Sequence, residues 1–206
     1  ESIDGINDRY DSLNIRVVRQ EARGLVGARN TGLNTSRGQI VSFIDDDVVV
    51  SEYWSQAIYD TFGNDSRIGG VSGPTIIPED KIGNRDILGF QNKIKNGLFW
   101  KIIGRIYISL VLENSPFSIG RIFKSGAFSL GSNYAEFSAL DSTFDVDYLE
   151  ACNMSFRKSV LDQTGGFLGE YGGLGDWSEP YLAFRVREIG YRLVFNPAAA
   201  VLHDIS

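Results

Sequence analysis

An apolar run that leads directly into three aspartates constrains this chain more than any other feature of its sequence. Residues Ile40–Ile44 are nearly all apolar, and Asp45, Asp46 and Asp47 follow without a break. An almost continuous apolar run is typical of a strand that is buried on both faces of a parallel sheet. Ligands bind such sheets at the carboxyl ends of their strands. The three carboxylates therefore stand where a site is expected.

The spacing of these aspartates indicates what they can bind. In an extended backbone Asp45 and Asp47 point to one side and Asp46 points to the other. A hard cation such as Mg²⁺ or Mn²⁺ prefers a few carboxylates together with phosphate oxygens and water. One interpretation is a metal and diphosphate site. The alternative is a solvated acidic turn that caps the following helix.

Strand-like and helix-like segments alternate along the chain. The pattern predicts strands at 15–18, 40–44, 68–77, 192–195 and 199–202, and helices at 27–37, 51–62, 155–163 and 180–189. In the second of these helices, Ser51 can act as the N-cap, and Trp54, Ala57, Ile58 and Phe62 would form its apolar face. This alternation favours an α/β fold, a Rossmann-like, mostly parallel sheet flanked by helices.

Two residue counts narrow the chemistry. Only one cysteine, Cys152, and one histidine, His203, occur among the 206 residues. One cysteine cannot form an internal disulfide, and one histidine excludes zinc sites built on two histidines. The 26 acidic residues outnumber the 20 basic ones and give a net charge of −6, which argues against nucleic acid as a partner. Catalysis, if present, must rest mainly on carboxylates.

Residues 81–124 differ from the rest of the chain in charge. They hold eight basic and two acidic residues, a local charge of +6. Their most apolar part, 98–112, is shorter than the roughly 20 residues that cross a bilayer as a helix. We expect this insert to contact a membrane surface or an anionic substrate. The alternative is a helix that packs on the domain with its charges in solvent.

Two further segments carry candidate residues. In GLVGARNTGL (24–33), Arg29 offers a planar fork that suits phosphate, although a surface helix residue is the simpler interpretation. In GDWSEPYL (175–182), Asp176 and Glu179 stand near the start of a helix, where the helix dipole favours an anionic carboxylate. Such a carboxylate suits a general base. Acidic residues also occur routinely at helix starts without any such role.

Four segments in this order resemble family-two glycosyltransferases with the GT-A fold. They are GLVGARNTGL, GQIVSFIDDDVVVSEYW, ACNMSFRKSVLDQTGGF and GDWSEPYLAFRVREIGYRLVFNPAAAVLH. The resemblance covers about residues 15–78 and 146–204. It implies an inverting transferase that uses a nucleotide-diphospho-sugar donor and a divalent cation, Mn²⁺ or Mg²⁺. It also implies that the chain is truncated at its N-terminus, because members begin with a strand, a helix and a second strand that are not seen here.

The resemblance assigns roles residue by residue. The metal ligands would be Asp47 and His203. The donor nucleotide sugar would be contacted by Arg29, Asn30, Asp45 and Asp46. The base would be Glu179, although the family usually has Glu-Asp where this chain has Ser178-Glu179, so Asp176 stays an alternative.

We expect one GT-A domain over 1–206. Its nucleotide-sugar and metal part covers about 1–80, its basic helical insert about 81–145, and its acceptor and catalytic part about 146–206. The acceptor is expected to be a saccharide or a lipid-linked hydroxyl in polysaccharide biosynthesis for the cell envelope. The expected location is the cytoplasm, at the inner face of the membrane. Two alternatives are a non-catalytic domain of this type that binds a partner or polysaccharide, and a nucleotidyltransferase, which would release pyrophosphate.

Overall fold

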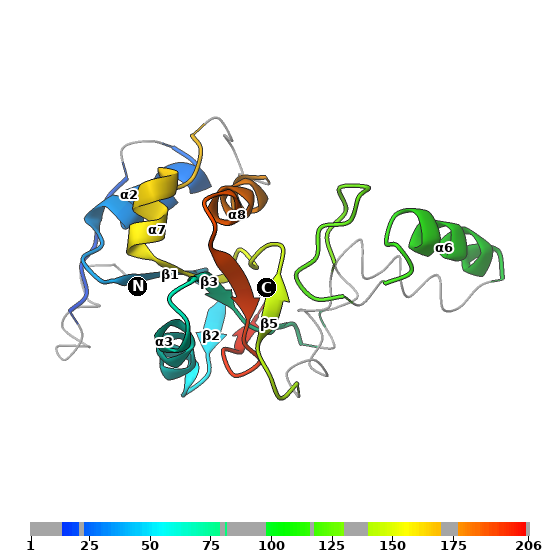
Figure 1. Ribbon diagram of the computed structural model, residues 1–206, viewed down its shortest axis with the longest axis horizontal. Helices are drawn as coiled ribbons and strands as arrows, with labels where there is room; N and C mark the ends of the chain where they lie inside the picture. The colour runs from blue at the N-terminus through cyan, green and yellow to red at the C-terminus, as the bar shows by residue number, and fades with distance from the viewer. Residues whose placement is uncertain are drawn as a thin grey trace.

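The structure is a computed structural model (Figure 1) that describes residues 14–20, 23–78, 81, 98–115, 118–129, 140–169 and 177–204. These residues form two β-sheets and five helices. The helices are α2 (Leu25–Thr35), α3 (Trp54–Asn64), α6 (Leu98–Leu110), α7 (Lys158–Thr164) and α8 (Ser178–Glu188). The strands are β1 (Ile40–Ile44), β2 (Val48–Val50), β3 (Ile68–Ser72), β4 (Thr75–Ile76), β5 (Phe144–Val146), β6 (Asn153–Arg157), β7 (Arg192–Phe195) and β8 (Val201–His203).

The larger sheet has the strand order β1-β6-β3-β7-β5. Only β3 and β7 pair in parallel, whereas β1–β6, β6–β3 and β7–β5 are antiparallel. The prediction of an α/β fold is confirmed, but the prediction of a mostly parallel sheet is wrong for these strands. The chain does return in the same direction from β1 through α3 to β3. However, β6 comes from much later in the sequence and fits between them in the opposite direction.

Strand β1 is less buried than its composition predicts. Its ladder runs to β6 on one side, and Ile44 at its end is 45% exposed. Within the part of the chain that the structure describes, β1 is an edge strand. The expectation of burial on both faces is wrong, because only Val41 of this strand is buried, whereas Ser42 and Ile44 are exposed.

Helices cover both faces of the larger sheet (Figure 1). Helices α2, α7 and α8 lie together on one face, where they bury Phe156, Leu161 and Leu182 with their neighbours. Helix α3 lies on the other face, where Trp54, Ile58 and Phe62 pack against β3, β7 and the chain next to β8. The apolar stripe predicted for this helix is confirmed.

Several element boundaries differ from the predictions. Helix α3 begins at Trp54 and has no side-chain cap, so Ser51 contributes only its carbonyl, which accepts from the Trp54 amide. Residues 15–18 form no strand. Helix α7 begins at Lys158, because residues 153–157 pair as β6 with two strands.

The smaller sheet has the order β2-β8-β4. Strand β8 pairs antiparallel with β2 and in parallel with β4. The turn of Asp46 and Asp47 separates β2 from β1. This sheet therefore brings the C-terminal strand β8 beside the chain that follows β1.

Helix α6 lies in the predicted basic insert and stands away from both sheets (Figure 1). The residues after it, 118–129, return to the sheet, where the Asp147 amide donates to Gly120 O at 2.6 Å. No helix in the described part of the chain is long and apolar enough to cross a bilayer.

Candidate functional site

Three predicted site residues converge where β1 ends. Asp45, Asp47 and His203 each offer one ligand atom, and these atoms lie within 4.8 Å of one another. Asp45 and Asp47 converge through a turn rather than through an extended backbone, since the Val48 amide donates to Asp45 O at 3.3 Å. His203 joins them because it pairs with Val48 in the β2–β8 ladder.

Contacts on both ring nitrogens orient His203. Its Nε2 atom lies 3.1 Å from Asp47 Oδ1, and the histidine side chain is only 11% exposed. Its Nδ1 atom lies 3.7 Å from Cys152 Sγ. Burial, with a smaller contribution from Glu150, raises the pKa of the Cys152 thiol to about 12, so the thiol is uncharged at neutral pH. The ring therefore has a neutral neighbour on one side and a carboxylate on the other.

The donor chemistry of this cluster fits a divalent cation. Two carboxylates and one imidazole suit a metal such as Mn²⁺, which takes oxygen ligands and accepts nitrogen. The geometry adds Asp45 to the pair that the resemblance implied, Asp47 and His203. Asp46 is exposed and stands outside the cluster. Phosphate oxygens of a donor would complete such a site, because Asp47 is 39% exposed on its open side.

Arg29 and Glu179 form an ion pair between α2 and α8. Their side chains are only 6% and 11% exposed. Ser178 Oγ lies 3.5 Å from Arg29 Nη1 and donates to Glu179 Oε2 at 3.2 Å. The guanidinium carbon also lies 5.3 Å from the centre of the Phe167 ring. Both charges are thus enclosed by protein groups.

This arrangement differs from what was expected of Arg29 and Asn30. Arg29 turns toward Glu179 instead of presenting a free fork, and it is not the surface residue of the simpler interpretation. The Asn30 side chain makes two hydrogen bonds to the backbone of Phe167: its Nδ2 donates to Phe167 O at 2.7 Å, and its Oδ1 accepts from Phe167 N at 3.0 Å. In this structure both side chains hold helices and loops together. Asp176, the alternative base, lies outside the described residues.

Comparison with known proteins identifies the family. Residues 2–119 match the model of glycosyl transferase family 2. The chain belongs to this family. The match covers more than half of the sequence and includes both aspartates of the cluster.

Two solved structures share the fold of this family-2 chain. Structure comparison with GalNAc-T7, solved with UDP, GalNAc and Mn²⁺, gives a TM-score of 0.60 at 15% identity and covers 96% of this chain and 34% of that one. A mannosyltransferase from Pyrobaculum calidifontis, in complex with GDP-Man and Mn²⁺, gives 0.53 at 17% identity and covers 100% and 46%. The predicted GT-A fold is confirmed. The chain spans between a third and a half of the length of these proteins.

Two residues that sequence reasoning missed position the histidine of the family-2 chain. Asn153, fully buried, accepts from Trp54 Nε1 at 2.9 Å and donates to Ala199 O at 2.9 Å. Gly73 lets the chain after β3 approach the same loop, since a Cβ there would lie 2.1 Å from Ala199 O. Both hold the loop that leads into β8. A polar residue inside the apolar segment ACNMSF was the available signal for Asn153.

Proposed function

We propose that this chain transfers a sugar from a nucleotide-diphospho-sugar to an acceptor hydroxyl, with a divalent cation and with inversion at the anomeric carbon. A saccharide or a lipid-linked sugar at the inner face of the membrane is the proposed acceptor, within polysaccharide biosynthesis. One observation carries the proposal: Asp45, Asp47 and His203 place their ligand atoms within 4.8 Å at the end of a strand. Membership of family 2 and the two solved complexes with Mn²⁺ support it.

The acidic cluster is the proposed metal site. A cation held by Asp45, Asp47 and His203 would offset the charge that develops on the departing nucleoside diphosphate. The residues of the chain contribute by fixing the ligands before the donor binds. Asp47 is held by His203, and its carbonyl accepts from the Asp204 amide at 3.0 Å. This preorganisation lowers the cost of assembling the site.

Glu179 is the proposed base. It would take the proton from the acceptor hydroxyl as that oxygen attacks the anomeric carbon from the face opposite the diphosphate, and a single displacement of this kind inverts the configuration. Arg29 and Ser178 would orient the carboxylate, because both contact it. A base must reach its proton donor within about 2.6–3.2 Å, so the acceptor has to approach the start of α8. Asp176 remains the alternative.

The ion pair between Glu179 and Arg29 favours a second candidate function, in which the domain is not catalytic. Because the Glu179 carboxylate is paired with Arg29 and 11% exposed, a domain of this type without catalysis, which binds a partner or polysaccharide, is the second candidate. The two functions differ in their products. Only the transferase releases nucleoside diphosphate when donor and acceptor are both present.

The test of the proposed function is a panel of nucleotide-sugar donors, scored by nucleoside diphosphate release with Mn²⁺ and with a chelator. We expect release that requires the metal with at least one donor. The Asp47→Asn variant should lose roughly 10²-fold or more in rate, because it removes a charged ligand from the metal. Asp60→Asn is the matched control, since Asp60 is an exposed acid of α3 that contacts Gln56.

Calorimetry with Mn²⁺ separates the outcomes. Normal release by Asp47→Asn, together with unchanged Mn²⁺ affinity, would show that the cluster is not the metal site. If the protein bound a donor but released no nucleoside diphosphate with any pair of donor and acceptor, the result would support the non-catalytic function. Release of pyrophosphate would indicate nucleotidyl transfer.

A further inference from the structure

Helix α6 presents an apolar stripe to the solvent. Phe99, Ile102, Ile106 and Leu110 are 67%, 59%, 56% and 74% exposed, and Ile103 is 36% exposed. Residues spaced by three or four positions lie on one face of a helix. These five positions therefore form a single face, which we call the α6 stripe. Large apolar side chains gathered on one exposed face mark an interaction surface.

The opposite side of α6 holds the helix to the protein. Gly104 is buried, and Tyr107 and Ile108 are half-buried. Beyond the helix, the Asn114 amide donates to Ile108 O at 2.9 Å and Ser125 Oγ donates to Val111 O at 2.7 Å. The loop after α6 therefore fixes which face points outward.

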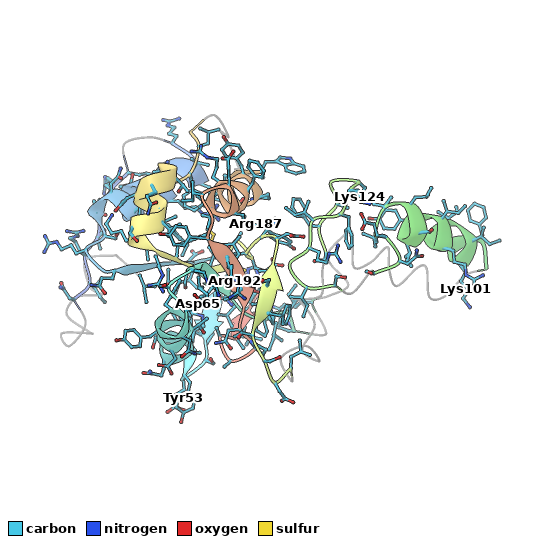
Figure 2. The ribbon with its side chains drawn as sticks, in the orientation of Figure 1. Tyr53, Asp65, Lys101, Lys124, Arg187 and Arg192 are labelled. Atoms are coloured by element: carbon cyan, nitrogen blue, oxygen red, sulfur yellow. The ribbon has the colours of Figure 1, made fainter. Side chains whose placement is uncertain are left out.

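Basic side chains lie outside the α6 stripe: Arg105 borders it next to Ile102, whereas Lys101 lies toward the other side of the helix, near Ile108. Lys101 and Arg105 are exposed on the helix itself, and Arg121 and Lys124 are exposed on the loop that follows. Figure 2 shows Lys101 on α6 and Lys124 on the loop between α6 and the sheets. Glu113, the one acidic residue in 98–115 and 118–129, is half-buried and accepts from the Lys124 amide at 2.8 Å. This part of the molecule is therefore locally basic in a chain of net charge −6.

An anionic lipid surface fits both features. An apolar stripe on one face of a helix, with basic residues on its other faces, is the pattern of helices that lie in the plane of the membrane interface. At 1.5 Å per residue, α6 is about 20 Å long, which is too short to cross the roughly 30 Å hydrocarbon layer. A second copy of the chain fits less well, because its α6 would bring the same basic residues into opposition. The acidic remainder of the chain would be repelled from anionic lipid, which orients the protein with α6 toward it.

We propose that α6 docks this protein on anionic membranes by inserting the α6 stripe at the interface, with Arg105 at the lipid phosphates and Lys101 adding to the local positive charge. The inference goes beyond sugar transfer, since lipid binding requires neither donor nor metal. The membrane contact was predicted for residues 81–124 as a whole, and this proposal assigns it to one face of α6. A lipid-linked acceptor would meet the enzyme at this surface.

Vesicle sedimentation of the whole chain tests the proposal, with phosphatidylcholine vesicles that either contain or lack phosphatidylserine. We expect binding that requires phosphatidylserine and weakens with salt. Ile102→Ser with Ile106→Ser should lower the partition coefficient about tenfold or more, because buried apolar area drives insertion. Lys101→Gln and Arg105→Gln should each lower it about fivefold, the contribution of one basic residue near an anionic surface.

Tyr59→Ser is the matched control, since Tyr59 is 66% exposed on α3; it should bind vesicles like the wild type. Circular dichroism checks that each variant folds. Equal binding to both kinds of vesicle, or unchanged binding of the double isoleucine variant, would overturn the proposal. Light scattering measures whether the protein self-associates through the α6 stripe instead of binding vesicles. If the isoleucine variant lost self-association while vesicle binding never occurred, the α6 stripe would be a contact between copies and the proposal would be wrong.

Discussion

Arg29 shows how a residue's role depends on its surroundings. The segment ARN suggested either a phosphate contact or a surface position, and the structure places the side chain inside, against Glu179 and the Phe167 ring. A charge in the protein interior requires a partner, because water no longer solvates it. The two residues therefore depend on each other for stability, whatever part Glu179 takes in catalysis.

Breaking this pair should be costly. Arg29→Met leaves the Glu179 carboxylate buried without its cation, so the free energy of unfolding should fall by roughly 3 kcal/mol. Arg29→Met combined with Glu179→Leu should recover much of that loss, because neither charge remains. Urea denaturation of the single and double variants measures both values. A double variant that is less stable than the sum of the two single changes would contradict this account.

The same position tests the proposed base. Glu179→Gln keeps the shape of the side chain and still accepts a bond from Arg29, so donor affinity should change little. Turnover should fall by roughly 10²-fold or more, the usual contribution of a positioned base. Single-turnover kinetics and donor titration separate the two effects. If Glu179→Gln keeps full turnover and Asp176→Asn is inactive, Asp176 is the base.

At the scale of elements, one charge cluster joins the α3–β3 connection to β7 and β5. Asp65 precedes β3 and contacts both Arg67 and Arg192, with Arg192 Nη1 2.9 Å from Asp65 Oδ2. Arg192 also reaches Asp145 of β5, at 2.6 Å. Figure 2 shows Asp65 and Arg192 near each other beside the larger sheet. Hydrogen bonds from the Arg67 side chain and amide lower the pKa of Asp65 to about 2, with a smaller contribution from Arg192.

The lowered pKa of Asp65 predicts how the stability of the protein changes in acid. Asp65 has a usual value of 3.8 and a folded value of about 2. Its contribution to stability is therefore present above about pH 4 and is lost as the pH falls toward 2. Asp65→Asn should lower the melting temperature at neutral pH, and the difference from wild type should shrink toward zero near pH 2.

Thermal melts from neutral pH down to pH 2, followed by circular dichroism, measure this difference. Asp162→Asn serves as the control, because Asp162 makes only an exposed pair with Lys158 within one helix. A constant difference between Asp65→Asn and the wild type at every pH would show that the ionised carboxylate is not the source.

At the scale of the whole molecule, the acidic cluster joins distant parts of the chain. Asp45 and Asp47 follow β1, whereas His203 belongs to the last described strand. Asn153 and Gly73 hold the loop before that strand in place. A cation and donor bound at the cluster would therefore bind the folded chain and not the unfolded one, and such binding stabilises the fold.

This linkage predicts that donor and Mn²⁺ together raise the melting temperature. A ligand at a hundred times its dissociation constant contributes about 2.7 kcal/mol. The shift should vanish with a chelator and in Asp47→Asn, and it should persist in Asp60→Asn. Calorimetric melts with and without UDP-sugar or GDP-sugar measure it. An equal shift in the presence of the chelator would show that the donor binds without the metal.

Local pattern was enough to predict a large part of this protein. The strand at Ile40–Ile44 and the apolar stripe of α3 were predicted where the structure has them, because runs and periodic spacing of apolar residues indicate the type and position of an element. The order of the motifs correctly indicated the family and the GT-A fold. The sequence also indicated the basic character of 81–124, although not which helical face is exposed.

Other features were decided only by tertiary structure. The position of β6 between β1 and β3 depends on hydrogen bonds between strands far apart in the sequence, and alternation along the chain gives strand direction but not strand neighbours. The burial of Arg29 against Glu179 likewise depends on how α2 and α8 meet. His203 reaches Asp47 only through the pairing of β8 with β2. A local pattern carries no information on such long-range pairs, because packing of the assembled sheets and helices selects them.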